Sequence, residues 1–157
     1  MEIIGKPKSA KFVYEDWAAK HLISPHATRK EKDIWWNTEM EYWRKGRFGL
    51  TGAQYFFLSQ ATIKEATGLR IKPIWRDLDD LIYQSYDEAR NTFWDLMVTK
   101  RREAGLSLTF GGVIPVWISL TNPGSTSLLT SADKTRLEEM FKDKTRVIYD
   151  GLDDYIR

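Results

Sequence analysis

Residues 93–107 read FWDLMVTKRREAGLS, in which an apolar run, a basic cluster and a glycine follow one another directly. The apolar run, residues 93–98, is short and rich in bulky side chains, and it predicts a buried strand. The basic cluster, residues 100–102, begins directly afterwards, and Gly105 stands where a helix could begin. This order of elements is the starting point for the fold.

The chain beyond Gly105 continues the same alternation of elements. Residues 107–120 are mostly apolar and predict a buried helix, which we expect Pro115 to kink. Residues 125–130 predict a second short strand, and Asp133 caps a further helix. Strand, helix and strand in this order form a βαβ unit, whose strands are parallel and whose crossover is right-handed. The sequence therefore predicts an α/β fold.

The first half of the chain predicts helices. Thr28 and Glu31 form a capping box that begins a helix ending before Gly46. Thr51 begins a second helical segment, and the bulky run at residues 55–58 predicts that this segment is buried.

Two further segments complete this half. Residues 64–73 suit a loop or a short strand, and residues 74–90 predict an amphipathic helix with acidic side chains in its first turns. With 157 residues the chain is expected to be one domain, in which a helical, aromatic-rich lead-in at 1–92 precedes the βαβ unit at 93–150.

Composition narrows the possible chemistry. Twenty-four Lys and Arg against 22 Asp and Glu leave a net charge of +2, which argues against wholesale coating of nucleic acid. The absence of cysteine, with only His21 and His26, argues against a disulfide framework, a zinc site or a histidine triad. Neither a membrane span nor a signal peptide is recognisable, so we expect no membrane association, no secretion and a cytoplasmic location.

The window from Lys100 to Ser107 partly matches the phosphate-binding pattern G-x-x-x-x-G-K-[ST]. Gly105 takes the place of the second glycine, and Ser107 that of the hydroxyl that ligates Mg²⁺. Lys100 stands where the first glycine belongs, and Leu106 where the phosphate-binding lysine belongs. On pattern alone, a solvated basic surface is the competing interpretation.

The same window resembles the displaced-lysine Walker A loop of the large terminase subunits of tailed bacteriophages, the ATPases that package viral DNA. Four other stretches also resemble these proteins, in particular those of phages of gut Bacteroidetes: residues 47–58, 73–77, 111–115 and 130–134. The resemblance covers about residues 30 to 150 and implies a partial P-loop NTPase, the N-terminal portion of the ATPase domain.

The resemblance also implies roles for particular residues, with ATP and Mg²⁺ as cofactors. The displaced cation would come from Lys100, helped by Arg101 or Arg102, although Arg101 and Arg102 are alternatively contacts to DNA or to a neighbouring subunit. The backbone around Gly105 would hold the phosphates and Ser107 the metal. The complete set of implied cofactor-binding residues is Gln54, Tyr55, Glu103, Ala104, Gly105, Leu106 and Ser107, in which Gln54 and Tyr55 would line the adenine pocket.

Hydrolysis also needs an apolar strand that ends in Asp and Glu. The nearest match, residues 147–150, ends in Asp150 but is followed by Gly151, and no nuclease carboxylate cluster is recognisable. We therefore expect the chain alone to be catalytically incomplete, whether as a truncated reading frame, an artificially shortened chain or the product of a split gene. Through the full-length protein, its implied partners are double-stranded DNA, the portal and the small terminase subunit, with homo-oligomerisation possible.

Two alternatives stay open. A noncatalytic nucleic-acid-binding module would use the mixed basic and aromatic residues between Trp43 and Phe48 as a stacking platform. An assembly protein could instead have kept the fold and lost nucleotide binding, which would agree with Leu106 in place of the lysine. We interpret Arg76 and Asp77 as a structural pair or helix cap rather than as a site.

Overall fold

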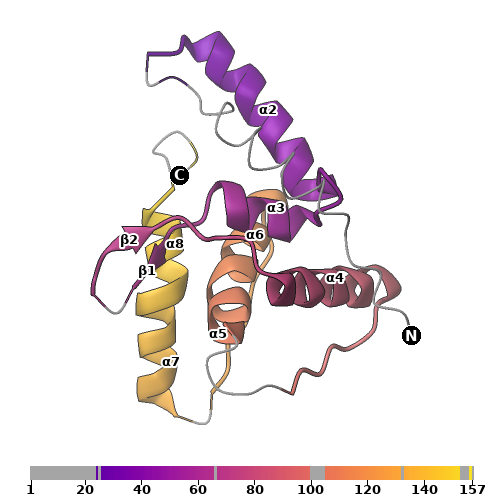
Figure 1. Cartoon of the computed structure of the whole chain (residues 1–157), viewed down its shortest axis with the longest axis vertical. Coiled ribbons are helices and arrows are strands. Elements are labelled where there is room, and N and C mark those ends of the chain that lie inside the picture. Colours follow the sequence, from indigo (N-terminus) through magenta and orange to yellow (C-terminus); the bar gives the residue numbers. More distant parts are fainter. Residues whose placement is uncertain are drawn as a thin grey trace.

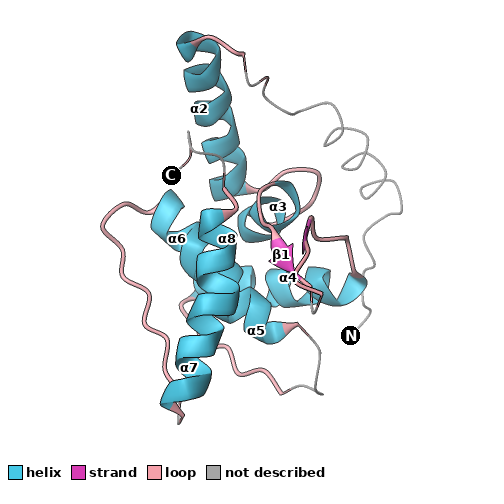
Figure 2. Ribbon diagram, turned by 90° about the vertical axis from the view of Figure 1, so that its left-hand side faces the viewer, coloured by secondary structure: helices cyan, strands magenta, loops and turns pink. Residues whose placement is uncertain are grey.

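The computed structural model describes Ser24 and residues 26–65, 67–99, 105–131, 133–152 and 156. Helices dominate the described residues, and their only sheet is a small antiparallel pair of strands (Figures 1 and 2). The fold is therefore mixed α/β and mostly helical. Within the described residues, no helix combines the length and the apolar composition needed to cross a membrane.

Helix α2, Arg29–Lys45, begins and ends as the sequence predicts. The Thr28 hydroxyl accepts a hydrogen bond from the Glu31 backbone at 3.3 Å, and the Glu31 carboxylate accepts one from the Thr28 N–H at 2.7 Å. Hydrogen bonds from Thr28 lower the pKa of Glu31. At the other end, Gly46 has φ of 81° and donates its N–H to the Tyr42 carbonyl. The capping box and the glycine stop are both confirmed.

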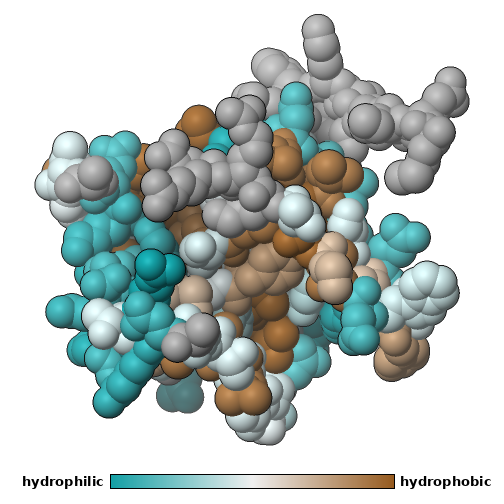
Figure 3. All heavy atoms as spheres, turned by 90° about the horizontal axis from the view of Figure 1, so that it is seen from below, coloured by the Kyte–Doolittle hydropathy of each residue, from teal (hydrophilic) through white to brown (hydrophobic). Residues whose placement is uncertain are grey.

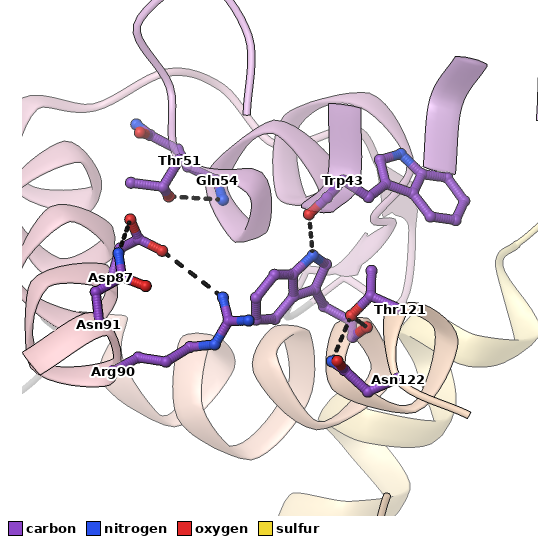
Figure 4. Close-up of polar contacts among 9 residues, drawn as sticks. Trp43, Thr51, Gln54, Asp87, Arg90, Asn91, Thr121 and Asn122 are labelled. Carbon is purple, nitrogen blue, oxygen red and sulfur yellow. Dashed lines mark hydrogen bonds and ion pairs between the residues drawn. The ribbon is translucent and has the colours of Figure 1, made fainter. Parts of the chain in front are cut away.

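Helix α3, Gly52–Ser59, is the centre of the hydrophobic core. Every residue from Gly52 to Leu58 is buried, as the bulky run at 55–58 predicts. Trp43 of α2 and Trp117 pack in the same core, and the Trp117 indole donates to the Trp43 carbonyl at 2.7 Å (Figure 4). The aromatic side chains in the described part of the lead-in therefore belong to this core or pack against it.

A short sheet and a helix follow α3. Strands β1, Ile63–Lys64, and β2, Arg70–Ile71, pair antiparallel with Ile63 opposite Ile71. Helix α4, Asp77–Thr92, then carries three acidic residues in its first turn, as predicted. Its buried residues are Asp79, Ile82 and Tyr83. Arg90, in its last turn, places its guanidinium 5.1 Å from the centre of the Trp117 ring (Figure 4).

The second half of the molecule is a pair of long helical segments that lie side by side (Figures 1 and 2). The first consists of α5, Leu106–Leu108, the π-helical stretch η1, Thr109–Val113, and α6, Ile114–Thr121. The second consists of α7, Lys134–Met140, the π-helical stretch η2, Phe141–Thr145, and α8, Arg146–Asp150. A π-helical stretch thus precedes Pro115, the residue at which the sequence predicts a kink.

Two glycines let these helices approach closely. A Cβ on Gly111 would lie 2.5 Å from the Met140 sulfur, and one on Gly112 would lie 2.9 Å from Cδ1 of Ile148. Because Pro115 has no N–H, the Gly111 carbonyl lacks the donor that residue i+4 of a helix normally supplies. The Thr145 hydroxyl donates to that carbonyl instead. The two π-helical stretches are therefore joined at their point of contact.

The two predicted parallel strands are not formed in the described residues. Residues 94–99 and 125–131 have no regular secondary structure, Phe93 lies in the turn that ends α4, and residues 93–98 are exposed rather than buried. The prediction that these segments are strands is therefore wrong for this chain. A strand needs a neighbour that supplies backbone partners, and this pairing is not encoded in the hydrophobic pattern of the segment itself.

Candidate nucleotide-binding site

The predicted phosphate loop is described only at its C-terminal end. Residues Lys100, Arg101, Arg102, Glu103 and Ala104 lie outside the described residues. Gly105 has φ of 79° and ψ of −3°, a left-handed conformation that glycine adopts at little cost. Its carbonyl accepts from the N–H groups of Leu108 and Thr109 at 2.9 and 3.1 Å, so a helix begins directly after it. The predicted succession of glycine and helix N-terminus is present.

Leu106 and Ser107 point to different surroundings. Leu106 is buried, whereas Ser107 is exposed. The position at which the phosphate-binding pattern has a lysine is thus part of the core, because an apolar side chain there packs inward. Ser107 lines a polar groove of about 370 Å³ together with Thr130, Ser131, Arg136, Glu139, Met140, Asp143 and Lys144. Its hydroxyl is accessible, with two basic and two acidic side chains in the same groove.

Arg76, a cation that the sequence pattern of the loop does not include, lies beside Gly105. A Cβ on Gly105 would be 2.8 Å from Nη2 of Arg76, so a side chain here would require the guanidinium to shift, in addition to adopting the left-handed conformation. Arg76 is held by Asp79 through two hydrogen bonds, Nε to Oδ2 at 2.7 Å and Nη2 to Oδ1 at 2.6 Å. The partner in this pair is Asp79 rather than the predicted Asp77.

The Arg76–Asp79 pair is asymmetric in its exposure. The Asp79 side chain is only 3% exposed, while the Arg76 side chain is 43% exposed and keeps Nη1 outside the paired edge. The hydrogen bonds from Arg76 to Asp79 raise the pKa of Arg76. The structure therefore fixes a guanidinium, paired with the Asp79 carboxylate, at the start of the 106–121 helix. The sequence signal was an arginine three residues before an aspartate at a helix start, which is typical of many structural pairs.

Tyr83 joins the same cluster from one turn further along α4. Its ring is fully buried, and burial raises the pKa of its hydroxyl well above the ordinary value of 10.0. Asp79 and Arg76 both act electrostatically on this hydroxyl, and Thr109 of the 106–121 helix lies beside it. Arg76, Asp79 and Tyr83 thus couple the first turns of α4 to the helix that follows Gly105.

The two residues predicted for an adenine pocket are engaged in the core. The Gln54 amide donates to Asp80 of α4 at 2.7 Å, and the Tyr55 hydroxyl donates to the buried carboxylate of Glu39 at 3.0 Å. Both side chains are buried, so in this conformation they stabilise the packing of α3. Gln54 does reach the same turn of α4 that carries Asp79, the partner of Arg76.

Packing also occupies the residues that the nucleic-acid-binding alternative would use as a stacking platform. Trp43 is completely buried, and the Arg47 guanidinium covers the rings of Tyr42 and Phe48 at 4.2 and 4.6 Å. A buried indole has no free face for a base. Among the described residues, no group of three or more His, Asp or Glu side chains forms a cluster that could hold a metal ion by itself.

Comparisons with known proteins return no relatives: no protein-family model, no curated protein and no solved structure matches the chain.

Proposed function

We propose that this chain is the nucleotide-binding, N-terminal portion of a DNA-packaging ATPase of the large terminase type. The observation that carries the proposal is Gly105 in a left-handed conformation directly before a helix N-terminus, with a fixed arginine beside it. The first N–H groups of a helix and its dipole attract phosphate oxygens. Together with the basic cluster at residues 100–102, this arrangement suits a triphosphate.

The proposed site takes its positive charge from several side chains. Leu106 is buried, so it leaves the lysine position of the pattern without a cation. We propose Lys100, Arg101 and Arg102 as its substitutes. Arg76, which lies beside Gly105, adds a guanidinium to the site. An arginine held by a carboxylate keeps its orientation, so it can meet a phosphate oxygen without losing much side-chain entropy.

Ser107 fits the proposed role of metal ligand. Its hydroxyl is exposed in the first turn of the helix, two residues after Gly105. In phosphate-loop proteins Mg²⁺ bridges such a hydroxyl and the β- and γ-phosphates, so most of its ligands come from the nucleotide and water. A protein cluster of carboxylates is not needed for this first contact.

The finer fold belongs to the same proposal. Segment 93–99, the glycine, the 106–121 helix, segment 125–131 and the 134–150 helix follow in the order of a βαβα unit. We propose that the two segments act as parallel strands in the complete ATPase, which would work on double-stranded DNA with a portal and a small terminase subunit. These roles rest on the resemblance in sequence.

Fluorescence titration with an N-methylanthraniloyl derivative of ATP, with and without Mg²⁺, tests nucleotide binding. Ser107→Ala should weaken the Mg²⁺-dependent affinity about tenfold, which corresponds to ~1.4 kcal/mol. Ser119→Ala is the matched control, because Ser119 is an exposed serine in the same helical segment and donates to its own helix at Pro115. Equal affinities of all three proteins, or no saturable signal in the wild type, would contradict the proposal.

A further inference from the structure

The polar groove that Ser107 lines contains a lysine to which no role has yet been assigned. Lys144, in η2, contributes to this groove from the second helical segment, whereas Ser107 belongs to the first. The ammonium group of Lys144 forms no ion pair and no hydrogen bond with any described residue. The other basic residue of the groove, Arg136, is paired with Asp133 at 3.4 Å. Lys144 is therefore the cation of this groove that is available to a ligand.

The contact between the two π-helical stretches holds Lys144 in place. A Cβ on Gly112 would lie 3.2 Å from the Cβ of Lys144, so the backbone of η1 lies against the base of this side chain. The next residue, Thr145, donates its hydroxyl to the Gly111 carbonyl. Ser107 lies about one helical turn before Gly111 in the same segment. One helix contact thus holds Ser107 and Lys144 in a shared groove, and π-helical turns are frequent at functional sites.

Two carboxylates, those of Glu139 and Asp143, balance the two cations of the groove. Oδ1 of Asp143 also lies 3.8 Å from Nζ of Lys64 in β1. Viewed from below, hydrophilic side chains gather on the side of the molecule that carries α7, and apolar ones in the middle (Figure 3). Carboxylates accept hydrogen bonds from water on Mg²⁺, while a lysine contacts phosphate oxygens. The groove, of about 370 Å³, therefore suits a phosphate group that carries a hydrated Mg²⁺.

We infer that Lys144 binds the terminal phosphate of a nucleoside triphosphate, so that the site distinguishes a triphosphate from a diphosphate. The inference rests on the proposed function, in which Mg²⁺ bridges the Ser107 hydroxyl and the β- and γ-phosphates. This bridge brings the γ-phosphate into the groove that Ser107 and Lys144 share. The ammonium group of a lysine is a compact charge with three donors, and its hydrogen bonds to phosphate oxygens are strengthened by charge.

Lys144 acts on a different phosphate from the cations near Gly105. Arg76 lies beside Gly105, and the basic cluster at residues 100–102 precedes it. In phosphate loops the backbone around the glycine holds the inner phosphates, which ADP and ATP share. Lys144 instead contacts a phosphate that ADP lacks. Loss of its charge should therefore change the preference for ATP over ADP, rather than the affinity for both nucleotides.

Isothermal titration calorimetry of the whole chain with Mg²⁺-ATP and with Mg²⁺-ADP measures this preference. Lys144→Gln should weaken ATP binding about tenfold and leave ADP binding unchanged. Lys142→Gln is the matched control, because Lys142 is an exposed lysine of the same stretch η2 that does not line the groove. It should leave both affinities unchanged. Lys144→Arg keeps the charge and should recover most of the preference for ATP.

A second measurement uses only the wild-type chain, so it stands even if a variant fails to fold. The backbone amide resonances of Asp143 and Lys144 should shift on addition of Mg²⁺-ATP and much less on addition of Mg²⁺-ADP. Equal losses of ATP and ADP affinity in Lys144→Gln, no loss of ATP affinity, or equal shifts with both nucleotides would overturn the inference and leave nucleotide binding in place. If the wild-type chain binds neither nucleotide, the proposed function fails and the inference fails with it.

Discussion

The guanidinium of Arg76 occupies the space that a side chain on residue 105 would need, with Nη2 lying 2.8 Å from the position of a Cβ on Gly105. Asp79, almost completely buried, holds the guanidinium there with two hydrogen bonds. The start of α4 and the start of the 106–121 helix, which are far apart in the sequence, thus lie side by side. The proposed phosphate site depends on this contact, because it combines a helix start with a fixed cation.

Substitution of Gly105 should destabilise the fold through two effects. Gly105→Ala forces a left-handed conformation on a residue with a Cβ, at a cost of about 1–2 kcal/mol, and also requires the Arg76 guanidinium to shift. Gly124→Ala is the control, because Gly124 has φ of 83° and open space around it. Urea unfolding should show the larger loss for Gly105→Ala.

A double-mutant cycle separates the two effects at Gly105. In an Arg76→Ala background the steric part disappears, so Gly105→Ala should then cost no more than Gly124→Ala. If the cost of Gly105→Ala is the same with and without Arg76, the side chain and the glycine are not in the contact described.

Arg76 should contribute to nucleotide affinity beyond its structural role. Arg76→Gln removes the fixed charge, and we expect the affinity for Mg²⁺-ATP to fall about five- to tenfold, or ~1–1.4 kcal/mol. Arg70→Gln removes an exposed positive charge from β2 and should leave the affinity unchanged, which controls for net charge. Isothermal titration calorimetry provides the comparison, and equal losses for both variants would indicate only long-range attraction.

Stability should fall at alkaline pH because of Tyr83. Burial raises the pKa of this hydroxyl in the folded chain above the ordinary value of 10.0. Its contribution is therefore complete below pH 10 and is lost as the pH rises toward the folded-state pKa, since only the unfolded chain then releases the proton. One such group gives a slope of ~1.4 kcal/mol per pH unit.

Urea unfolding between pH 9 and about 11 measures this slope. Tyr83→Phe should reduce it without removing it, because burial also raises the pKa of Tyr86. Tyr149→Phe, at a tyrosine that is 44% exposed, should keep the wild-type slope. An unchanged slope in Tyr83→Phe would contradict the burial of this hydroxyl.

The hydrogen bond from Thr145 to Gly111 should stabilise the contact between the helical segments. Thr145→Val removes the donor while keeping the shape of the side chain, and we expect a loss of about 1 kcal/mol. Thr135→Val, at an exposed position of α7, is the control. In a Pro115→Ala background, the new N–H of residue 115 can donate to Gly111, so the cost of Thr145→Val should shrink. A cost independent of Pro115 would refute the explanation of this bond.

Local signals in the sequence predicted the local structure well. The pairing of Thr28 with Glu31, the stop at Gly46 and the buried run after Thr51 each involve residues within one or two helical turns. The predicted strands failed for the opposite reason. Whether residues 93–98 form a strand depends on which backbone lies beside them, and a hydrophobic pattern carries no information about that neighbour.

In the candidate site, too, the local features were predictable from the sequence and the long-range contacts were not. Gly105 and the helix after it were predictable from a glycine followed by an apolar run, and Leu106 is buried because it is apolar. The position of Arg76 was not predictable, because its contact with Gly105 spans two elements distant in sequence. The π-helical stretches were anticipated only as an irregularity near Pro115, since the Thr145 partner lies in another helix.

Titration of the isotopically labelled chain with Mg²⁺-ATP, followed through its backbone amide resonances, tests the central claim most directly. If the start of the 106–121 helix binds phosphate, the amides of Gly105, Leu106 and Ser107 should shift together and saturably, while Gly124 stays unchanged. No saturable shift at these amides, or shifts confined to another part of the molecule, would contradict nucleotide binding at this loop.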